Sequence, residues 1–194
     1  GTVYAEPVGR YGIEQSVFLN DWHNVRFYGR HAEFVRSPRG IAQGVYLAFE
    51  RTRDLVADFF MVRGAFQWRD SQVWFAPGIR TLDVQRATFS DIGIYNVAGD
   101  FALIRDGSVD VTLENFQMEV AGRQGIAITN ADNTIVRDGF LKWVRRSCID
   151  LEPYIWSRYV RGTRIERVIG ETFTNYFVAG RGASDLYMAD CVGI

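Results

Sequence analysis

A pair of mostly apolar residues, two positions apart, returns seven times along the chain and constrains its fold more than any other feature. Residues i and i+2 of a strand point to the same face, so each pair marks one strand. Strands that return every 23–30 residues are typical of a solenoid. The pairs are Val25/Phe27, Leu55/Ala57, Leu82/Val84, Val111/Leu113, Thr134/Val136, Thr163/Ile165 and Leu186/Met188. The next inward-facing residues are expected at Phe60, Ala87, Phe116, Phe140, Val168 and Cys191.

A second strand-like segment precedes most of these pairs, and helical periodicity does not persist anywhere, which makes the chain all-β. Strands that stack about every 25 residues in one direction form parallel sheets coiled into a tube, with neighbouring strands ~4.8 Å apart. We therefore predict one domain over residues 1–194, a single-stranded parallel β-helix of about seven rungs. A β-sandwich is the alternative, but its strands come about every 8–12 residues. The second segments are Val45–Leu47, Val73–Phe75, Phe101–Leu103, Ile126–Ile128, Ile149–Leu151 and Phe177–Val178.

Composition and charge exclude some classes of function. The net charge of −1 gives no support to binding of nucleic acid or of an anionic membrane surface. No apolar run approaches the ~20 residues that cross a bilayer. Cys148 and Cys191 are expected to be buried free thiols. Twenty-one arginines stand against one lysine, Lys142; planar guanidinium groups would suit an acidic sugar polymer, although a GC-rich genome would give the same excess.

The phrases Asn24–Gly29 and Asp54–Asp58, and the start Gly1–Tyr11, resemble the repeats and the first strand of pectate-lyase-3 and tailspike-like proteins. These belong to the pectin-lyase-like superfamily of right-handed parallel β-helices, and the resemblance covers essentially the whole chain. It implies a right-handed coil, a polysaccharide partner and an extracellular or virion-associated protein. In that family a capping helix precedes such a start and a cap closes the last rung. Neither is visible here, so we expect residues 1–194 to be part of a longer protein, or a truncated gene product, with an uncapped C-terminal end.

The candidate catalytic residues are Asp150 and Glu152. Asp150 is expected to face outward between Ile149 and Leu151, and Glu152 is the next outward residue, roughly 6.5–7 Å along the strand. Two carboxylates at this spacing can divide the acid and base roles of glycoside hydrolysis. They stand before the long connection 153–162, and long loops on a rigid scaffold often carry binding residues. The candidate substrate-binding residues are Trp74, Tyr154, Trp156, Arg146 and Arg158.

Outward positions on the neighbouring rungs are expected to continue this surface. The positions aligned with Asp150 are Tyr46, Trp74, Ala102, Ala127 and Phe177, and those aligned with Glu152 are Ala48, Ala76, Ile104, Thr129 and Ala179. Small residues with aromatic residues along one line suit a groove in which sugar rings stack. The same line would also suit contact with another subunit, as in a homotrimer, or with a covering loop.

The function predicted from these features is binding of a polysaccharide and its cleavage, by a glycosidase rather than a lyase. The polygalacturonase motifs (an Asp-Asp pair, Gly-His-Gly and Arg-x-Lys) are absent from the sequence. Ala127 and Phe177 flank Asp150, so the calcium cluster of pectate lyases is not supported, and neither a metal site nor a cofactor is predicted. The alternative function is a non-catalytic structural shaft, as in a trimeric phage tailspike or a surface adhesin.

Overall fold

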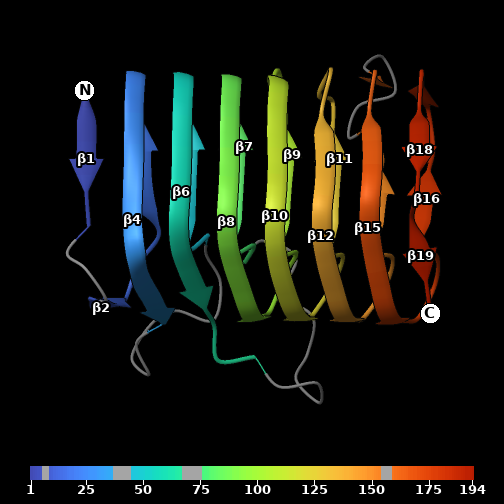
Figure 1. Cartoon of the computed structure of the whole chain (residues 1–194), viewed down its shortest axis with the longest axis horizontal. Coiled ribbons are helices and arrows are strands. Elements are labelled where there is room, and N and C mark those ends of the chain that lie inside the picture. Colours follow the sequence, from blue (N-terminus) through green and yellow to red (C-terminus); the bar gives the residue numbers. More distant parts are fainter. Residues whose placement is uncertain (6–8, 37–44, 67–75, 154–158) are drawn as a thin grey trace.

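The computed structural model describes residues 1–5, 9–36, 45–66, 76–153 and 159–194, and regular structure in these ranges is entirely β. The strands lie side by side from one end of the molecule to the other (Figure 1). This part of the chain holds no helix that could span a membrane. The strands are β1 (Thr2–Tyr4), β2 (Arg10–Ile13), β3 (Val17–Asn20), β4 (His23–Arg36), β5 (Leu47–Glu50), β6 (Arg53–Arg63), β7 (Ile79–Leu82), β8 (Gln85–Val97), β9 (Ala102–Arg105), β10 (Val109–Ala121), β11 (Ile126–Thr129), β12 (Ile135–Val144), β13 (Ile149–Leu151), β14 (Val160–Arg161), β15 (Arg164–Phe173), β16 (Val178–Gly180), β17 (Ala183–Ser184), β18 (Tyr187–Ala189) and β19 (Val192–Gly193).

Two parallel sheets form the walls of a coil. The long-strand sheet runs β1-β4-β6-β8-β10-β12-β15-β18, with β2 beside β4 and β19 beside β15. The short-strand sheet runs β16-β13-β11-β9-β7-β5-β3, and β14 pairs with β17. From β3 to β13 the chain alternates between the two sheets, and all these pairings are parallel. The right-handed parallel β-helix is therefore confirmed, and a sandwich of antiparallel sheets is excluded.

Inward side chains of successive rungs stack on one another and form one continuous core. The long-strand sheet contributes a buried column in register, made of Phe27, Ala57, Phe89, Leu113, Val136 and Ile165. The short-strand sheet contributes a second column, made of Leu47, Ile79, Ala102, Ile126, Ile149 and Val178. The alternation that marked the strands in the sequence thus has its cause in burial against this core.

Strands β6, β8, β10, β12 and β15 each bend near the middle, at a residue with a positive φ. These residues are Phe59, Asp91, Asn115, Asp138 and Arg167, with φ between 50° and 55°. Left-handed geometry turns the strand, and the next inward residue follows three positions after the last one, as in Leu113 followed by Phe116. Asn and Asp tolerate this conformation because their short side chains bond locally; Asn115 Nδ2 donates a hydrogen bond to Asp91 Oδ1 on the preceding rung.

The predicted pair Leu82/Val84 is wrong. The residues in register with Leu55 and Ala57 are Ala87 and Phe89, five positions further along the chain. Val84 is buried, but it lies between β7 and β8 and belongs to neither strand.

The predicted inward position of Phe140 is also wrong. Phe140 is paired with Gln117 and lies on the outer face, while Gly139 takes the inward position beside Phe116. Phe116 is inward-facing and 4% exposed, as predicted, but its neighbours are Ile92 and Gly139.

Arginine side chains join neighbouring rungs. A rung step of ~4.8 Å brings side chains of one column within reach, and a guanidinium group can hold both oxygens of a carboxylate. The inter-rung pairs are Arg51–Asp21, Arg26–Asp58, Arg63–Glu33, Arg80–Glu50, Arg86–Asp54, Arg123–Asp100, Arg137–Glu114 and Arg167–Asp138. A large part of the arginine excess therefore serves the fold itself, with no sugar ligand needed to explain it.

Candidate active site

Strand β13 places Asp150 on the face opposite the core. Ile149 and Leu151 on either side of it are fully buried in the core cluster. Asp150 lies outside that cluster but is only 8% exposed, whereas Glu152, just after the strand, is exposed. The negative charge of Glu152, two residues further along the chain, raises the pKa of the Asp150 carboxyl group. The strand alternation predicted the orientation of Asp150 because Ile149 and Leu151 on either side of it face the core.

A buried hydrogen-bond chain connects Asp150 to the two preceding rungs. Gln124 Nε2 donates to Asp150 Oδ2 at 2.7 Å, and Gln124 Oε1 accepts from the backbone N–H of Ser147 at 2.9 Å. The backbone N–H of Gln124 donates to Asp100 Oδ1 at 2.9 Å. Arg123 Nη1 lies 2.7 Å from Asp100 Oδ2 and closes the chain with an ion pair. Gln124 is buried and Asp100 has no exposed surface, so solvent screens this pair weakly.

Burial dominates the proton affinity of both aspartates in the chain. The pKa of Asp100 is about 6, because burial, together with the charge of Asp150, outweighs the opposing effects of Arg123 and the Gln124 N–H. Burial also raises the pKa of Asp150, and the nearby Glu152 adds to this effect. The charges of Arg123 and Arg146 and the Gln124 hydrogen bond oppose the shift at Asp150. Asp150 is thus a carboxyl group with a raised proton affinity beside an exposed carboxylate.

Small residues flank Asp150 on its own sheet. Ala127 and Ala179 pair with it directly, and Ala127 had been predicted at this position. Further along the same row lie Leu103, Arg80, Ala48 and Phe18. The floor on either side of Asp150 is therefore made of alanine methyl groups.

The predicted aromatic line beside Asp150 is wrong. Tyr46 is buried in the core cluster, and Phe177 packs against that cluster. Ala102 is in register with Ile126 and so points inward. Ile104, predicted beside Glu152, is in register with Ile128 and is likewise part of the core.

Four predicted substrate-binding residues, Trp74, Tyr154, Trp156 and Arg158, lie outside the described residues. The fifth, Arg146, stands in the turn before β13, and its charge reaches Asp150. Lys142 pairs with Glu171 at 2.7 Å.

No family model matches the sequence, and no curated protein sequence matches it. The structure is similar to the catalytic domain of a GH87 α-1,3-glucanase in complex with tetrasaccharides, with a TM-score of 0.76 and 13% identity over 99% of this chain and 34% of that chain. It is also similar to a candidate glycosyl hydrolase from Parabacteroides merdae, with a TM-score of 0.52 and 10% identity over 84% of this chain and 83% of that one. The chain spans about a third of the glucanase domain.

The chain shares the parallel β-helix fold with these structures. In this β-helix, the Asp150 site lies on the outer face of the short-strand sheet, two rungs beyond Asp100. Within the described ranges, no three His, Cys, Asp or Glu side chains gather in a way that could hold a metal ion.

The strand pattern of the sequence did not point to Asp100, Arg123 or Gln124. All three belong to the turns that lead from a long strand into the next short strand, before β9 and before β11. Aligning these turns with one another, rather than aligning only the strands, would have brought Asp100 and Gln124 into one column. The signal was therefore present, but it lay in the corners of the repeat.

Proposed function

We propose that the protein binds a polysaccharide and hydrolyses it at the outer face of the short-strand sheet, with Asp150 as general acid and Glu152 as general base. One observation carries this proposal. A buried carboxyl group with a raised pKa, that of Asp150, lies two residues before the exposed carboxylate of Glu152. An environment that separates the proton affinities of two neighbouring carboxyl groups is the usual basis for dividing these roles.

The proposed reaction is a single displacement. The proton on Asp150 passes to the glycosidic oxygen as the bond from that oxygen to the anomeric carbon breaks. Glu152 removes a proton from a water molecule whose oxygen forms the new bond to the same carbon. A spacing of roughly 6.5–7 Å between i and i+2 positions leaves room for that water, so inversion of the anomeric configuration is expected.

An α-1,3-glucan is the first substrate to test, because the similar glucanase domain was solved with tetrasaccharides. An acidic polymer such as polygalacturonate is the comparison substrate, since Arg146 lies close enough to act on Asp150. Trp74, Tyr154, Trp156 and Arg158 remain proposed substrate contacts. An extracellular or virion-associated location suits such a polymer, and light scattering would detect the homotrimer expected of a structural shaft.

The test is hydrolysis of α-1,3-linked oligosaccharides by Asp150→Asn and Glu152→Gln. Each variant should lose at least about a hundredfold in kcat/KM, in the range of losses for general acid–base groups, while its melting temperature stays unchanged. Glu166→Gln is the matched control, because Glu166 pairs with Arg164 on the other sheet. Full activity in both site variants would overturn the assignment of these two residues.

A further inference from the structure

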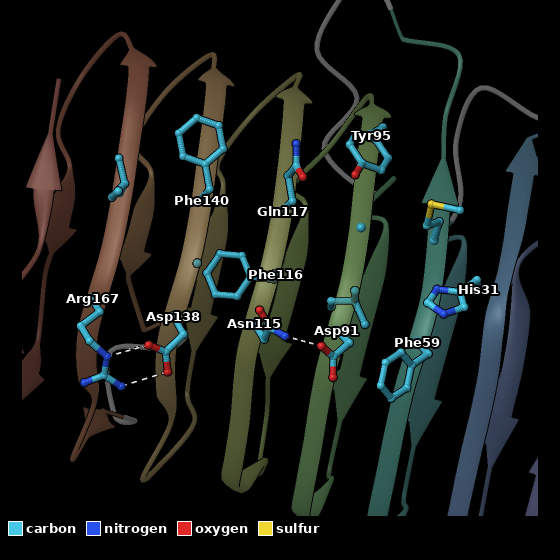
Figure 2. A pocket seen from close by; sticks show the side chains of 15 residues that line it. His31, Phe59, Asp91, Tyr95, Asn115, Phe116, Gln117, Asp138, Phe140 and Arg167 are labelled. Atoms are coloured by element: carbon cyan, nitrogen blue, oxygen red, sulfur yellow. Dashed lines mark hydrogen bonds and ion pairs between the residues drawn. The ribbon is translucent and has the colours of Figure 1, made fainter.

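A concave surface lies on the other wall of the β-helix. This groove, with a volume of about 750 Å³, lies over the bend of the long strands and extends across β6, β8, β10, β12 and β15 (Figure 2). Asp150 and Glu152 stand on the short-strand sheet, so the groove is separate from the proposed catalytic site. We call it the bend groove.

The rungs set a regular step along the bend groove. Gly93, Gln117, Phe140 and Ile169 occupy equivalent positions on four successive strands, ~4.8 Å apart. Gly93 contributes no side chain to the floor, and the ring of Tyr95 folds over it, so that a Cβ at Gly93 would lie 2.7 Å from that ring. One rung step is close to the length that one pyranose unit adds to an extended glycan.

One end of the bend groove is an apolar shelf. Phe140 and Ile169 are neighbours in register, and Ile169 is 42% exposed. Among the described residues no aromatic ring packs against Phe140. At the opposite end, Phe59 is held edge-on against His31, with ring centroids 5.5 Å apart. Figure 2 shows Phe140 and Phe59 on opposite sides of Asn115 and Asp91, with the ring of Phe116 between them.

The middle of the bend groove is polar. Asn115 and Gln117 are exposed, and each has four hydrogen-bonding positions on its amide. Asn115 donates one hydrogen bond to Asp91, and Gln117 Nε2 donates one to Glu119 Oε1 at 2.7 Å, while both residues line the groove. Amides between apolar ring surfaces match a ligand that alternates C–H faces with hydroxyl groups.

Charge in the bend groove disfavours a polyanion. Asp138 and Arg167 pair through two hydrogen bonds of 2.6 and 2.9 Å and largely cancel one another. Asp91 is hydrogen-bonded to the neutral amide of Asn115, so among the described residues no positive charge cancels it, and the residues that line the groove carry a net negative charge. A uronate chain would meet repulsion there, whereas a neutral chain would not.

We infer that the bend groove is a second carbohydrate-binding site, which holds a neutral polysaccharide strand along the axis of the β-helix. The sugar rings stack on Phe140 and Phe59, and their hydroxyl groups bond to Asn115 and Gln117. The choice of an α-1,3-glucan as probe rests on the proposed function; the site itself rests on the groove. A polymer held on this face would keep the protein on its substrate between cleavage events.

The test measures depletion of the protein from solution by insoluble α-1,3-glucan, in a background that carries Asp150→Asn and Glu152→Gln. Phe140→Ala and Gln117→Ala should each raise the Kd for the particles at least tenfold. The control is Trp143→Ala, because Trp143 is on the same strand and is 43% exposed but does not line the groove. Its Kd should stay within twofold of the parent value. Circular dichroism verifies that each variant remains folded.

In the catalytically intact protein, Phe140→Ala should leave hydrolysis of a soluble tetrasaccharide unchanged. Unaltered particle binding by both groove variants, no particle binding by the parent, or release of bound protein by soluble polygalacturonate would each overturn the inference. Groove-dependent binding without any hydrolysis would support this site and overturn the proposed function. Hydrolysis of the tetrasaccharide without groove-dependent binding would do the reverse.

Discussion

Gln124 donates a hydrogen bond from Nε2 to Asp150 Oδ2 over 2.7 Å, and so ties the turn before β11 to strand β13 of the next rung. The same amide accepts the backbone N–H of Ser147, which fixes its orientation. Because the bond stabilises the ionised form of Asp150, it holds the pKa of that group below the value that burial and Glu152 would otherwise produce.

Replacement of Gln124 by Met should therefore raise the pKa of Asp150. If Asp150 is the general acid, the alkaline limb of the kcat/KM profile moves to higher pH. The variant also loses the acceptor for Ser147 N–H, so its free energy of unfolding should fall by about 1–3 kcal/mol. Gln85→Met, on the other sheet, is the control for the change of side chain. An alkaline limb that does not move would show that another group controls it.

Asp100 should make the protein less stable as the pH rises from about 4 to about 6. Its pKa is about 6 in the folded protein against 3.8 for the ordinary group, because burial penalises the charge. Between these two pKa values the folded state binds more protons than the unfolded state, so stability falls as the pH rises. Above the pKa of the folded state the stability levels off. Across this pH range, the free energy of unfolding of the wild type should fall by about 2–3 kcal/mol relative to that of the Asp100→Asn variant. Urea denaturation of both proteins from pH 4 to pH 8 would measure this, and a constant difference would contradict it.

Arg123→Met should lower the free energy of unfolding more at pH 8 than at pH 4.5. At pH 8 the variant leaves the Asp100 carboxylate buried without its cation, a loss of about 3–5 kcal/mol. At pH 4.5 Asp100 takes up a proton, so most of the cost disappears. Arg137→Met is the control, since its partner Glu114 is partly exposed and its ion pair is worth less. Equal costs for Arg123→Met at the two pH values would show that Asp100 stays ionised.

The rung period and the direction of Asp150 could be predicted from the sequence because both follow from burial. Ile149 and Leu151 must face the core, so Asp150 between them cannot. The same rule failed where it ignored the left-handed residue in each long strand. The bend at Asp138 moves the inward position to Gly139, and a glycine carries no apolar signal, so the neighbouring Phe140 attracted the assignment.

The other residues of the site could not be predicted from the sequence, because the rungs differ in length. Val73–Phe75, predicted as a strand, lies outside the described residues, and the strand in register with Leu47 begins at Ile79. The contact from Gln124 to Asp150 crosses 26 residues and depends on how a turn of one rung stacks on a strand of the next. The strand pattern does not report such a contact, because polar residues in the turns do not follow its alternation of buried and exposed positions.

Gly139→Ala should destabilise the protein strongly, and Phe116→Ala should relieve most of that effect. The ring of Phe116 occupies the position that a Cβ on Gly139 would take. Phe116→Ala alone should cost about 3–5 kcal/mol through the cavity it leaves. The double variant should be more stable than the sum of the two single changes implies, by at least about 1 kcal/mol. Gly12→Ala is the control, since nothing lies near a Cβ at that position. Strictly additive costs would mean that ring and glycine do not share this space.

The two cysteines should differ widely in reactivity. Cys148 is fully buried, and burial raises the pKa of its thiol to about 12, from an ordinary value of 9.0. Its thiolate fraction at pH 8 is therefore about a thousandfold below that of an unperturbed thiol, and reagents cannot reach it. Cys191 is partly exposed near the last strands, where its Sγ donates to the carbonyl of Ala189 at 3.2 Å.

Iodoacetamide at pH 8 should accordingly alkylate one thiol per native chain, and mass spectrometry of peptides should find the label on Cys191. Cys148 should react rapidly only in denaturant. In native buffer its much slower reaction rate should follow the unfolding equilibrium. Cys191→Ser should remove the native reaction, whereas Cys148→Ala should leave it intact. Prompt labelling of Cys148 in the native Cys191→Ser variant would mean that the turn before β13 opens readily. The hydrogen-bond chain that holds Asp150 in place starts at that turn, so the same result would also count against a fixed position for the proposed general acid.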